Sequence, residues 1–196
     1  MQQIQIINFE AKHMKYIFLS FLLISVIGSS AQTSANDMQV TLTGIGPFKV
    51  NMKKTEVEKI INQKINTPNS NKKENYENDT VQITYKGASL TIVFYPNYTG
   101  ENKTETSVYS ISSSSAFLKT KSGITTGDDK IKIINTYNEF DFNYYYNYEN
   151  AGEEDYKRSK TNSTLMLIGE NSPSVLYFHF INNKVVSFEV SVFEGC

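Results

Sequence analysis

The chain has 196 residues, with 19 Lys and Arg against 20 Asp and Glu, which gives a formal net charge of −1 at pH 7. This near balance argues against a nucleic-acid-binding or anionic-membrane-binding surface, because both need clustered basic side chains. Tyr and Phe are frequent, Trp is absent, and Asn and Ser are abundant, a composition typical of a β-rich, loop-rich soluble protein.

The amino terminus has the pattern of a cleavable secretory signal peptide over residues 1–31. A basic region that includes Lys15 precedes an uncharged, mostly apolar run at 16–27, and the small-x-small site Ser29-Ser30-Ala31 follows it. This run is much shorter than the roughly 20 residues that a helix needs to span a bilayer. We therefore expect an exported protein, periplasmic or secreted, with no stable membrane anchor and with Met14 as an alternative start.

Cys196, the last residue, is the only cysteine in the chain. An intramolecular disulfide is therefore excluded, and we expect either a thiol that packs against the last strand or a bridge that forms a dimer. Ala31-Gln32 stands where a lipoprotein would carry its lipid-bearing cysteine, so a lipid anchor is not expected.

An internal duplication organises the rest of the chain. The segment 48–61 aligns without a gap on the segment 124–137. In each copy a residue suited to positive φ, Asn51 or Gly127, precedes polar residues and then apolar residues at helical spacing. The two copies therefore predict two helices in corresponding places, each after a short leading strand.

Each predicted helix, at 53–63 and at 128–138, is followed by strands with alternating apolar residues. The predicted strands lie near 81–85, 90–95 and 108–111 in the first copy and near 163–167, 176–180 and 185–188 in the second. The apolar faces of the two middle strands consist of Leu90, Ile92 and Phe94, and of Leu176, Phe178 and Phe180.

The hydrophobic pattern predicts the register of the last hairpin. A two-residue turn at Asn182-Asn183 would pair Phe178 with Ser187, a core residue with a polar one. A slip of one residue moves every side chain to the wrong face, so we expect a three-residue loop over 182–184. The expected pairs are Phe180 with Val186, Phe178 with Phe188, and Leu176 with Val190.

These elements predict an α+β protein made of two tandem helix-plus-antiparallel-sheet repeats, 38–118 and 119–196, with the helices packed on one face of the sheet or sheets. The helix starts at 50–57 and 126–133 and the strand segment 178–188 resemble the beta-lactamase inhibitor protein superfamily, which includes small outer-membrane-assembly lipoproteins. The resemblance implies a non-enzymatic bacterial protein that binds other proteins through its sheet.

His179 is the only histidine after the signal peptide. Alternation places it opposite Ser187 and diagonal to Glu189, on the face away from the core, which suggests a hydrolase triad. However, a catalytic nucleophile usually lies on a strained, exposed turn, and polar neighbours are common on a solvated sheet face. We therefore predict no catalytic residue. Because two Cys or His ligands cannot complete a closed zinc site and no phosphate-loop spacing occurs, we predict no metal and no cofactor.

The most unusual stretch is the tyrosine-rich segment 139–148, which continues into the acidic segment 149–155. Tyrosine offers a large, rigid contact area with a polar tip, so we predict an exposed binding loop with an acidic rim that favours a basic partner. The alternative is an extra strand that covers the end of a helix. The candidate protein-binding residues are Tyr144, Tyr145, Tyr146, Tyr148, Tyr177 and His179.

The sequence thus predicts an exported, non-enzymatic module that uses a sheet face and the tyrosine-rich loop to bind another protein rather than a nucleic acid. One alternative is a structural or assembly component of the cell envelope. A hydrolase that uses His179 is a third, less favoured hypothesis.

The cleavage site generates the first testable prediction. We expect the mature protein to begin at Gln32, because Ser29 and Ala31 occupy the two positions that signal peptidase recognises. Amino-terminal sequencing of the exported protein measures this directly. Recovery of a chain that still begins at Met1 or Met14 would contradict it.

Overall fold

The structure is a computed structural model, and the chain divides into two units, Met1–Asn36 and Asp37–Cys196. The residues that the structure describes all belong to the second unit, and they are 38–66, 79–98, 104–152, 155–170 and 172–193. The predicted signal peptide and Cys196 lie outside them.

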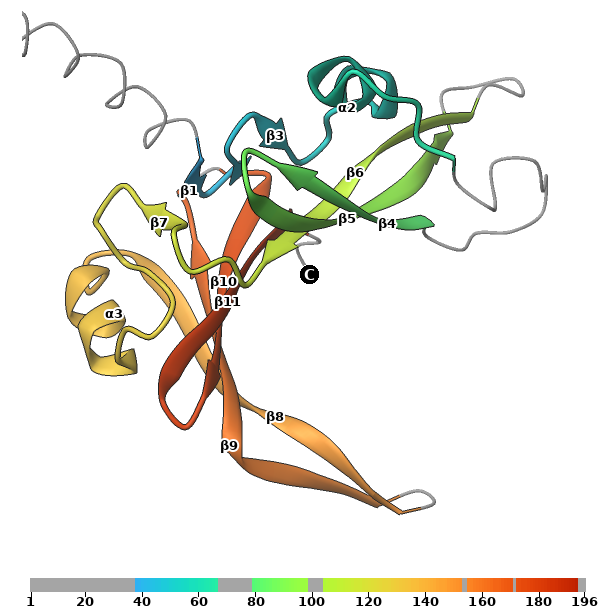
Figure 1. Ribbon diagram of the computed structural model, residues 1–196. Helices are drawn as coiled ribbons and strands as arrows, with labels where there is room; N and C mark the ends of the chain where they lie inside the picture. The colour runs from blue at the N-terminus through green and yellow to red at the C-terminus, as the bar shows by residue number, and fades with distance from the viewer. Residues whose placement is uncertain (1–37, 67–78, 99–103, 153–154, 171, 194–196) are drawn as a thin grey trace, which may run out of the picture. The chain divides into compact units, whose positions relative to one another are not determined.

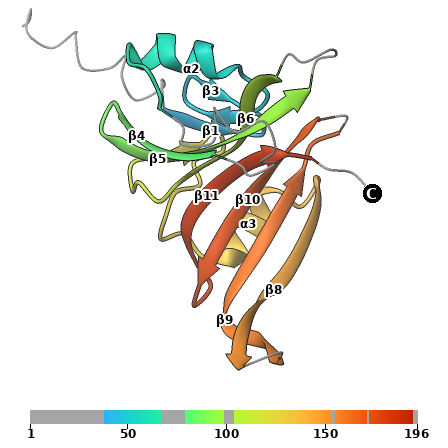
Figure 2. The same ribbon diagram turned by 90° about the vertical axis from the view of Figure 1, so that its right-hand side faces the viewer.

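The described part of the chain is built around a seven-stranded antiparallel sheet with the order β4-β5-β6-β11-β10-β9-β8 (Figures 1 and 2). Its strands are β4 (Asp79–Tyr85), β5 (Ala88–Tyr98), β6 (Thr104–Ser113), β8 (Asp141–Gly152), β9 (Asp155–Ile168), β10 (Ser174–Ile181) and β11 (Lys184–Val192). A second sheet has the order β3-β2-β1-β7. Its short strands are β1 (Gln39–Thr41), β2 (Gly44–Ile45), β3 (Phe48–Lys49) and β7 (Lys119–Thr120).

The predicted α+β class is wrong, because the protein is mostly β. Strands hold 59% of the described residues, whereas the two described helices, α2 (Lys54–Ile61) and α3 (Lys130–Thr136), have eight and seven residues. Both helices start where the sequence predicts but end early, α2 at a left-handed Asn62. Helices of two turns are too short to form a layer over a sheet, and each of them buries one side chain fully, Val57 or Ile133.

The start of α2 is bonded to the last strand of its half of the chain. Asn51 has a φ of 63°, and its N–H donates to the carbonyl oxygen of Val108 in β6 at 2.8 Å. The N–H of Val108 donates in return to the carbonyl oxygen of Met52 at 2.9 Å. An ion pair of 2.7 Å between Lys53 and Glu105 lies beside these bonds.

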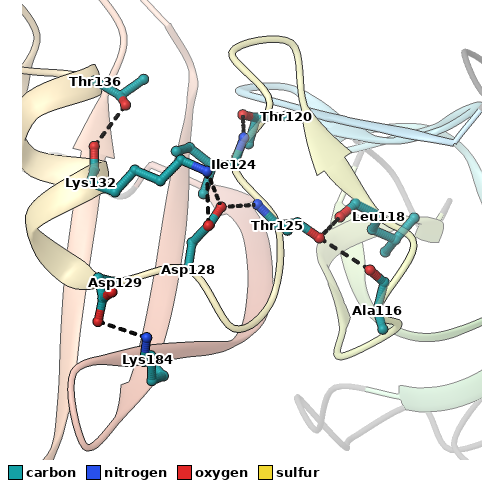
Figure 3. Close-up of polar contacts among 10 residues, drawn as sticks. All are labelled: Ala116, Leu118, Thr120, Ile124, Thr125, Asp128, Asp129, Lys132, Thr136 and Lys184. Carbon is teal, nitrogen blue, oxygen red and sulfur yellow. Dashed lines mark hydrogen bonds and ion pairs between the residues drawn. The ribbon is translucent and has the colours of Figure 1, made fainter.

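The start of α3 repeats this arrangement against β11. Gly127 has a φ of 86°, and its N–H donates to the carbonyl oxygen of Val185 at 2.8 Å. The N–H of Val185 donates in return to the carbonyl oxygen of Asp128 at 3.0 Å. The adjacent ion pair has the opposite polarity, since Asp129 of the helix start meets Lys184 of the strand at 2.9 Å (Figure 3). The two halves thus have equivalent helix–strand junctions, which supports the interpretation of a duplication.

Asp128 also binds the loop before α3, as Figure 3 shows. Its carboxylate accepts hydrogen bonds from the N–H of Thr125 at 2.8 Å and from the ammonium group of Lys132 at 2.8 Å and 2.9 Å. Burial raises the pKa of Asp128, but these hydrogen bonds outweigh it, so the pKa lies below its usual value. The hydroxyl of Thr125 contacts the carbonyl oxygen of Leu118 at 2.9 Å. These contacts fix the position of the helix that carries Lys130.

The register of the last hairpin is partly as predicted. Phe178 pairs with Phe188 and Leu176 pairs with Val190, which confirms these two predicted pairs. The predicted three-residue loop is wrong, because the turn consists of Asn182-Asn183, which have φ values of 51° and 62°. Two left-handed residues suit a two-residue turn that follows the twist of the strands.

A β-bulge reconciles this short turn with the buried face. The register shifts between His179 and Phe180, so that Phe180 pairs with Val185 and not with the predicted Val186. The first half has the equivalent bulge between Val93 and Phe94. The predicted apolar faces of both middle strands are buried: Leu90, Ile92, Phe94, Leu176, Phe178 and Phe180 are each at most 2% exposed.

Strands β6 and β11 join the two halves at the centre of the large sheet. Reading outward from this pair, β5 and β4 follow on one side and β10 and β9 on the other. This order is the one that two copies of a helix followed by three strands would produce when joined at their last strands. Strand β8 has no counterpart among the described residues of the first half, and it forms an edge of the sheet beside β9.

Candidate functional site

The tyrosine-rich segment is a strand, so the loop prediction is wrong and its alternative, an extra strand, is correct. Strand β8 pairs with β9 from Asp141 to Gly152. The reason is a two-residue period: Phe142, Tyr144 and Tyr146 turn toward the core side, and polar Asn143 and exposed Tyr145 occupy the other face.

The sheet register separates the six candidate binding residues into two groups on opposite faces. Tyr145 pairs with Thr164, which pairs in turn with His179, so Tyr145 shares the outer face with His179 and Tyr177. Tyr144 pairs with the buried Leu165 and therefore lies on the core face. Tyr144, Tyr146 and Tyr148, spaced by two residues, follow one another along that face. The outer-face group and the core-face group cannot act as one contact surface.

Beyond the large sheet, β8 and β9 continue as a two-stranded ribbon. Strand β10 pairs with β9 only from Asn162 to Ile168, whereas β8 and β9 remain paired at Tyr148–Arg158 and Asn150–Tyr156 (Figure 1). We call residues 147–152 with 155–161 the distal ribbon. Tyr148 and Tyr156 are each 69% exposed there, and the register places them on one face. We call Tyr144, Tyr146, Tyr148 and Tyr156 the tyrosine stripe.

Two cations lie against rings of the tyrosine stripe. The ammonium group of Lys130 lies 4.6 Å from the ring centroid of Tyr144 and 3.3 Å from its hydroxyl. The guanidinium group of Arg158 lies 4.0 Å from the ring centroid of Tyr146, and the two rings meet edge to face at 5.5 Å. Cation–π contacts of this kind hold each cation in place at the ring face.

The hydroxyl of Tyr144 responds to these neighbours. Burial raises the pKa of Tyr144, but hydrogen bonds with Ser163, Lys130 and Tyr146, together with the charge of Lys130, outweigh it. The pKa of Tyr144 therefore lies below its ordinary value, which marks a locally positive environment at this end of the stripe.

On the outer face, His179 connects four strands. Its Nε2 lies 3.1 Å from a carboxylate oxygen of Glu189 in β11, as the predicted diagonal placement implies, and its Nδ1 lies 3.2 Å from the hydroxyl of Thr164 in β9. That hydroxyl donates to the side-chain oxygen of Asn147 in β8 at 2.9 Å. Tyr145 belongs to the same group, since burial and then the charge of Glu189 raise the pKa of its phenol.

The predicted Ser-His-acid arrangement differs in its hydroxyl, which belongs to Thr164 and not to Ser187. Thr164 is 2% exposed, so an acyl substrate could not reach its oxygen. Its hydroxyl also contacts the side-chain oxygen of Asn147, and the carboxylate of Glu189 can only accept, so Nε2 of His179 donates to Glu189. The geometry favours a cross-link between strands.

The part of the chain that the structure describes contains neither a cluster of metal ligands nor a membrane-spanning helix. No three His, Cys, Asp or Glu side chains gather there as ligands of one metal ion. Neither α2 nor α3 has the length and apolar character of a membrane-spanning helix.

Sequence reasoning missed three members of the stripe region: Lys130, Tyr156 and Arg158. The spacing of Tyr156 and Arg158 by two residues was a signal for one strand face. The pairing of Arg158 with Tyr148 was not predictable, because the register shifts between Tyr146 and Tyr148 and leaves residues 159–162 of β9 opposite a single residue of β8. No local pattern indicates the contact of Lys130 with Tyr144 across 14 residues of chain.

We compared the chain with protein-family models, with curated protein sequences and with solved structures, and none of these comparisons found a match. The resemblance to the beta-lactamase inhibitor protein superfamily therefore stays a prediction from sequence.

The hydrogen-bonded group around His179 generates a prediction about stability. We expect Thr164→Val to lower the free energy of unfolding by about 1–3 kcal/mol, because it leaves partly buried groups of His179 and Asn147 without a partner. Thr161→Val, at an exposed position of the same strand, should change it by no more than about 0.5 kcal/mol. Urea denaturation compares the two variants with the parent. A Thr164→Val protein of parental stability that loses esterase activity toward p-nitrophenyl acetate would instead identify Thr164 as catalytic.

Proposed function

We propose that this protein is an exported, non-enzymatic binding module that contacts another protein through the tyrosine stripe. The observation that carries the proposal is the exposure of Tyr148 and Tyr156 on one face of the distal ribbon, 69% each. Contiguous exposed aromatic surface usually marks an interaction site, and tyrosine is enriched among the residues that dominate binding energy.

The ribbon itself supports this function. An isolated two-stranded ribbon is marginally stable in water, because each strand has only one neighbour and little apolar surface to bury. In the part of β9 before Asn162, no described strand other than β8 pairs with it, whereas β10 supports it from Asn162 onward. A partner that covers Tyr148 and Tyr156 would bury aromatic surface and supply the missing layer. Binding of a partner would thus account for the exposure of two large rings on the ribbon.

Export is the second part of the proposal, and it rests on the pattern of residues 1–31, which lie outside the described residues. The basic region, the short apolar run and the Ser29-Ser30-Ala31 site support it. The proposed partner is therefore a protein that the chain meets outside the cytoplasm.

A binding experiment with matched variants tests the stripe. The mature chain would be immobilised and exposed to the extracytoplasmic protein fraction of the source cells, and each retained protein would then be purified and titrated. We expect the double variant Tyr148→Ser/Tyr156→Ser to bind the purified partner at least about 30-fold more weakly than the parent, as loss of an aromatic hot spot would.

Phe117→Ser is the control, because Phe117 is also an exposed ring, 53% exposed, but lies outside the ribbon. Its affinity should remain within about twofold of the parent. Equal affinities of the double variant, the control and the parent, with unchanged circular dichroism spectra, would refute the stripe as the contact surface.

A further inference from the structure

The two cations of the tyrosine stripe differ from most of the lysines whose contacts the structure describes. Lys53, Lys64, Lys132 and Lys184 each form an ion pair with a carboxylate at 2.7–2.9 Å. Among the described residues, Lys130 and Arg158 form no ion pair, and their contacts are instead with tyrosine rings and a phenol hydroxyl. Both charges are thus positioned, and no described carboxylate pairs with them.

Three described acids near the stripe, Asp128, Asp129 and Glu149, are already engaged elsewhere. Asp129 pairs with Lys184, and Asp128 pairs with Lys132. Glu149 is opposite Lys157 in the register, on the ribbon face away from the stripe, where it accepts hydrogen bonds from Ser159 and Asn162. Of the predicted acidic rim, Glu149 faces away from the stripe, and the side chains of residues 153–155 lie outside the described part of the chain.

Ring stacking leaves the hydrogen-bonding capacity of both cations available. A guanidinium group stacked on a ring keeps its N–H donors in the plane of the group, where they can bind the two oxygens of one carboxylate. The ammonium group of Lys130 uses one of its three donors on the hydroxyl of Tyr144. Since the rings already restrict both side chains, an incoming carboxylate would cost less conformational entropy than at a mobile lysine.

We propose that the tyrosine stripe recognises an acidic segment of its protein partner. Carboxylates of this segment bind Arg158 and Lys130, while its apolar side chains pack on Tyr148 and Tyr156. The inference rests on the proposed function and names the chemistry of its partner. It reverses the basic partner expected from the acidic segment 149–155.

A titration with defined peptides tests the charge preference. The probes are a rhodamine-labelled peptide of ten glutamates and, as its counterpart, one of ten lysines, followed by fluorescence anisotropy at low salt. We expect the parent to bind the glutamate peptide and not the lysine peptide, and we expect this binding to weaken at least about tenfold when salt rises from about 50 to about 500 mM.

Single substitutions then locate the site. We expect Arg158→Met and Lys130→Met each to weaken binding of the glutamate peptide at least about fivefold. Lys157→Met is the matched control, because it removes the same charge from the neighbouring position on the other ribbon face, and it should change the affinity less than about twofold. Thermal melts followed by circular dichroism verify that each variant is folded.

Three outcomes overturn the inference: equal binding of both peptides, no binding of the glutamate peptide, or equal losses in Lys157→Met and Arg158→Met. The purified partner separates this failure from that of the proposed function. If Tyr148→Ser/Tyr156→Ser loses the partner while Arg158→Met and Lys130→Met keep it, the acidic segment is wrong and the tyrosine stripe stands as the contact surface. If all of these variants keep the partner, both proposals fail.

Discussion

The pairing of β6 with β11 is the constraint on which the rest of the structure depends. Four residue pairs, from Phe188–Ser113 to Ser191–Ser110, turn two three-stranded halves into one sheet. The same two strands hold the helix starts, through Val108 in β6 and Val185 in β11. An edge strand exposes unpaired backbone groups, so joining the halves at these strands removes two edges, and β4 and β8 are the edges of the large sheet in the described part of the chain.

Local periodicity was sufficient to predict the inner strands and the positions of the helix starts. The alternation of Leu176, Phe178 and Phe180 identified a buried face, and Asn51 and Gly127 marked left-handed residues before the helices. Sequence could not decide between a three-residue loop and a two-residue turn with a bulge, because both bury the same phenylalanines. The helix lengths were overestimated, because apolar spacing continues past Asn62, the left-handed residue that ends α2.

The candidate site was only partly predictable, and for a different reason. The tyrosines were identified, but their polar neighbours suggested a loop, although the same alternation is the pattern of an edge strand with one solvated face. Which tyrosines share a face follows from the two-residue period. Which charges accompany them does not, because Lys130 reaches Tyr144 from α3 and Arg158 reaches Tyr146 across a bulged strand pair. Long-range pairing therefore places two cations against the stripe that no local sequence pattern indicates.

Native-state hydrogen exchange tests most directly the claim that one cooperative sheet carries a weakly supported ribbon. We expect the hydrogen-bonded amides of β6 and β11 to exchange as slowly as those of β5 and β10, through global unfolding, because the joined strands form one core. The amides of the distal ribbon should exchange through local opening, at least about a hundredfold faster. Exchange of the β6–β11 amides as fast as that of the ribbon, or two halves with separate opening free energies, would contradict this account.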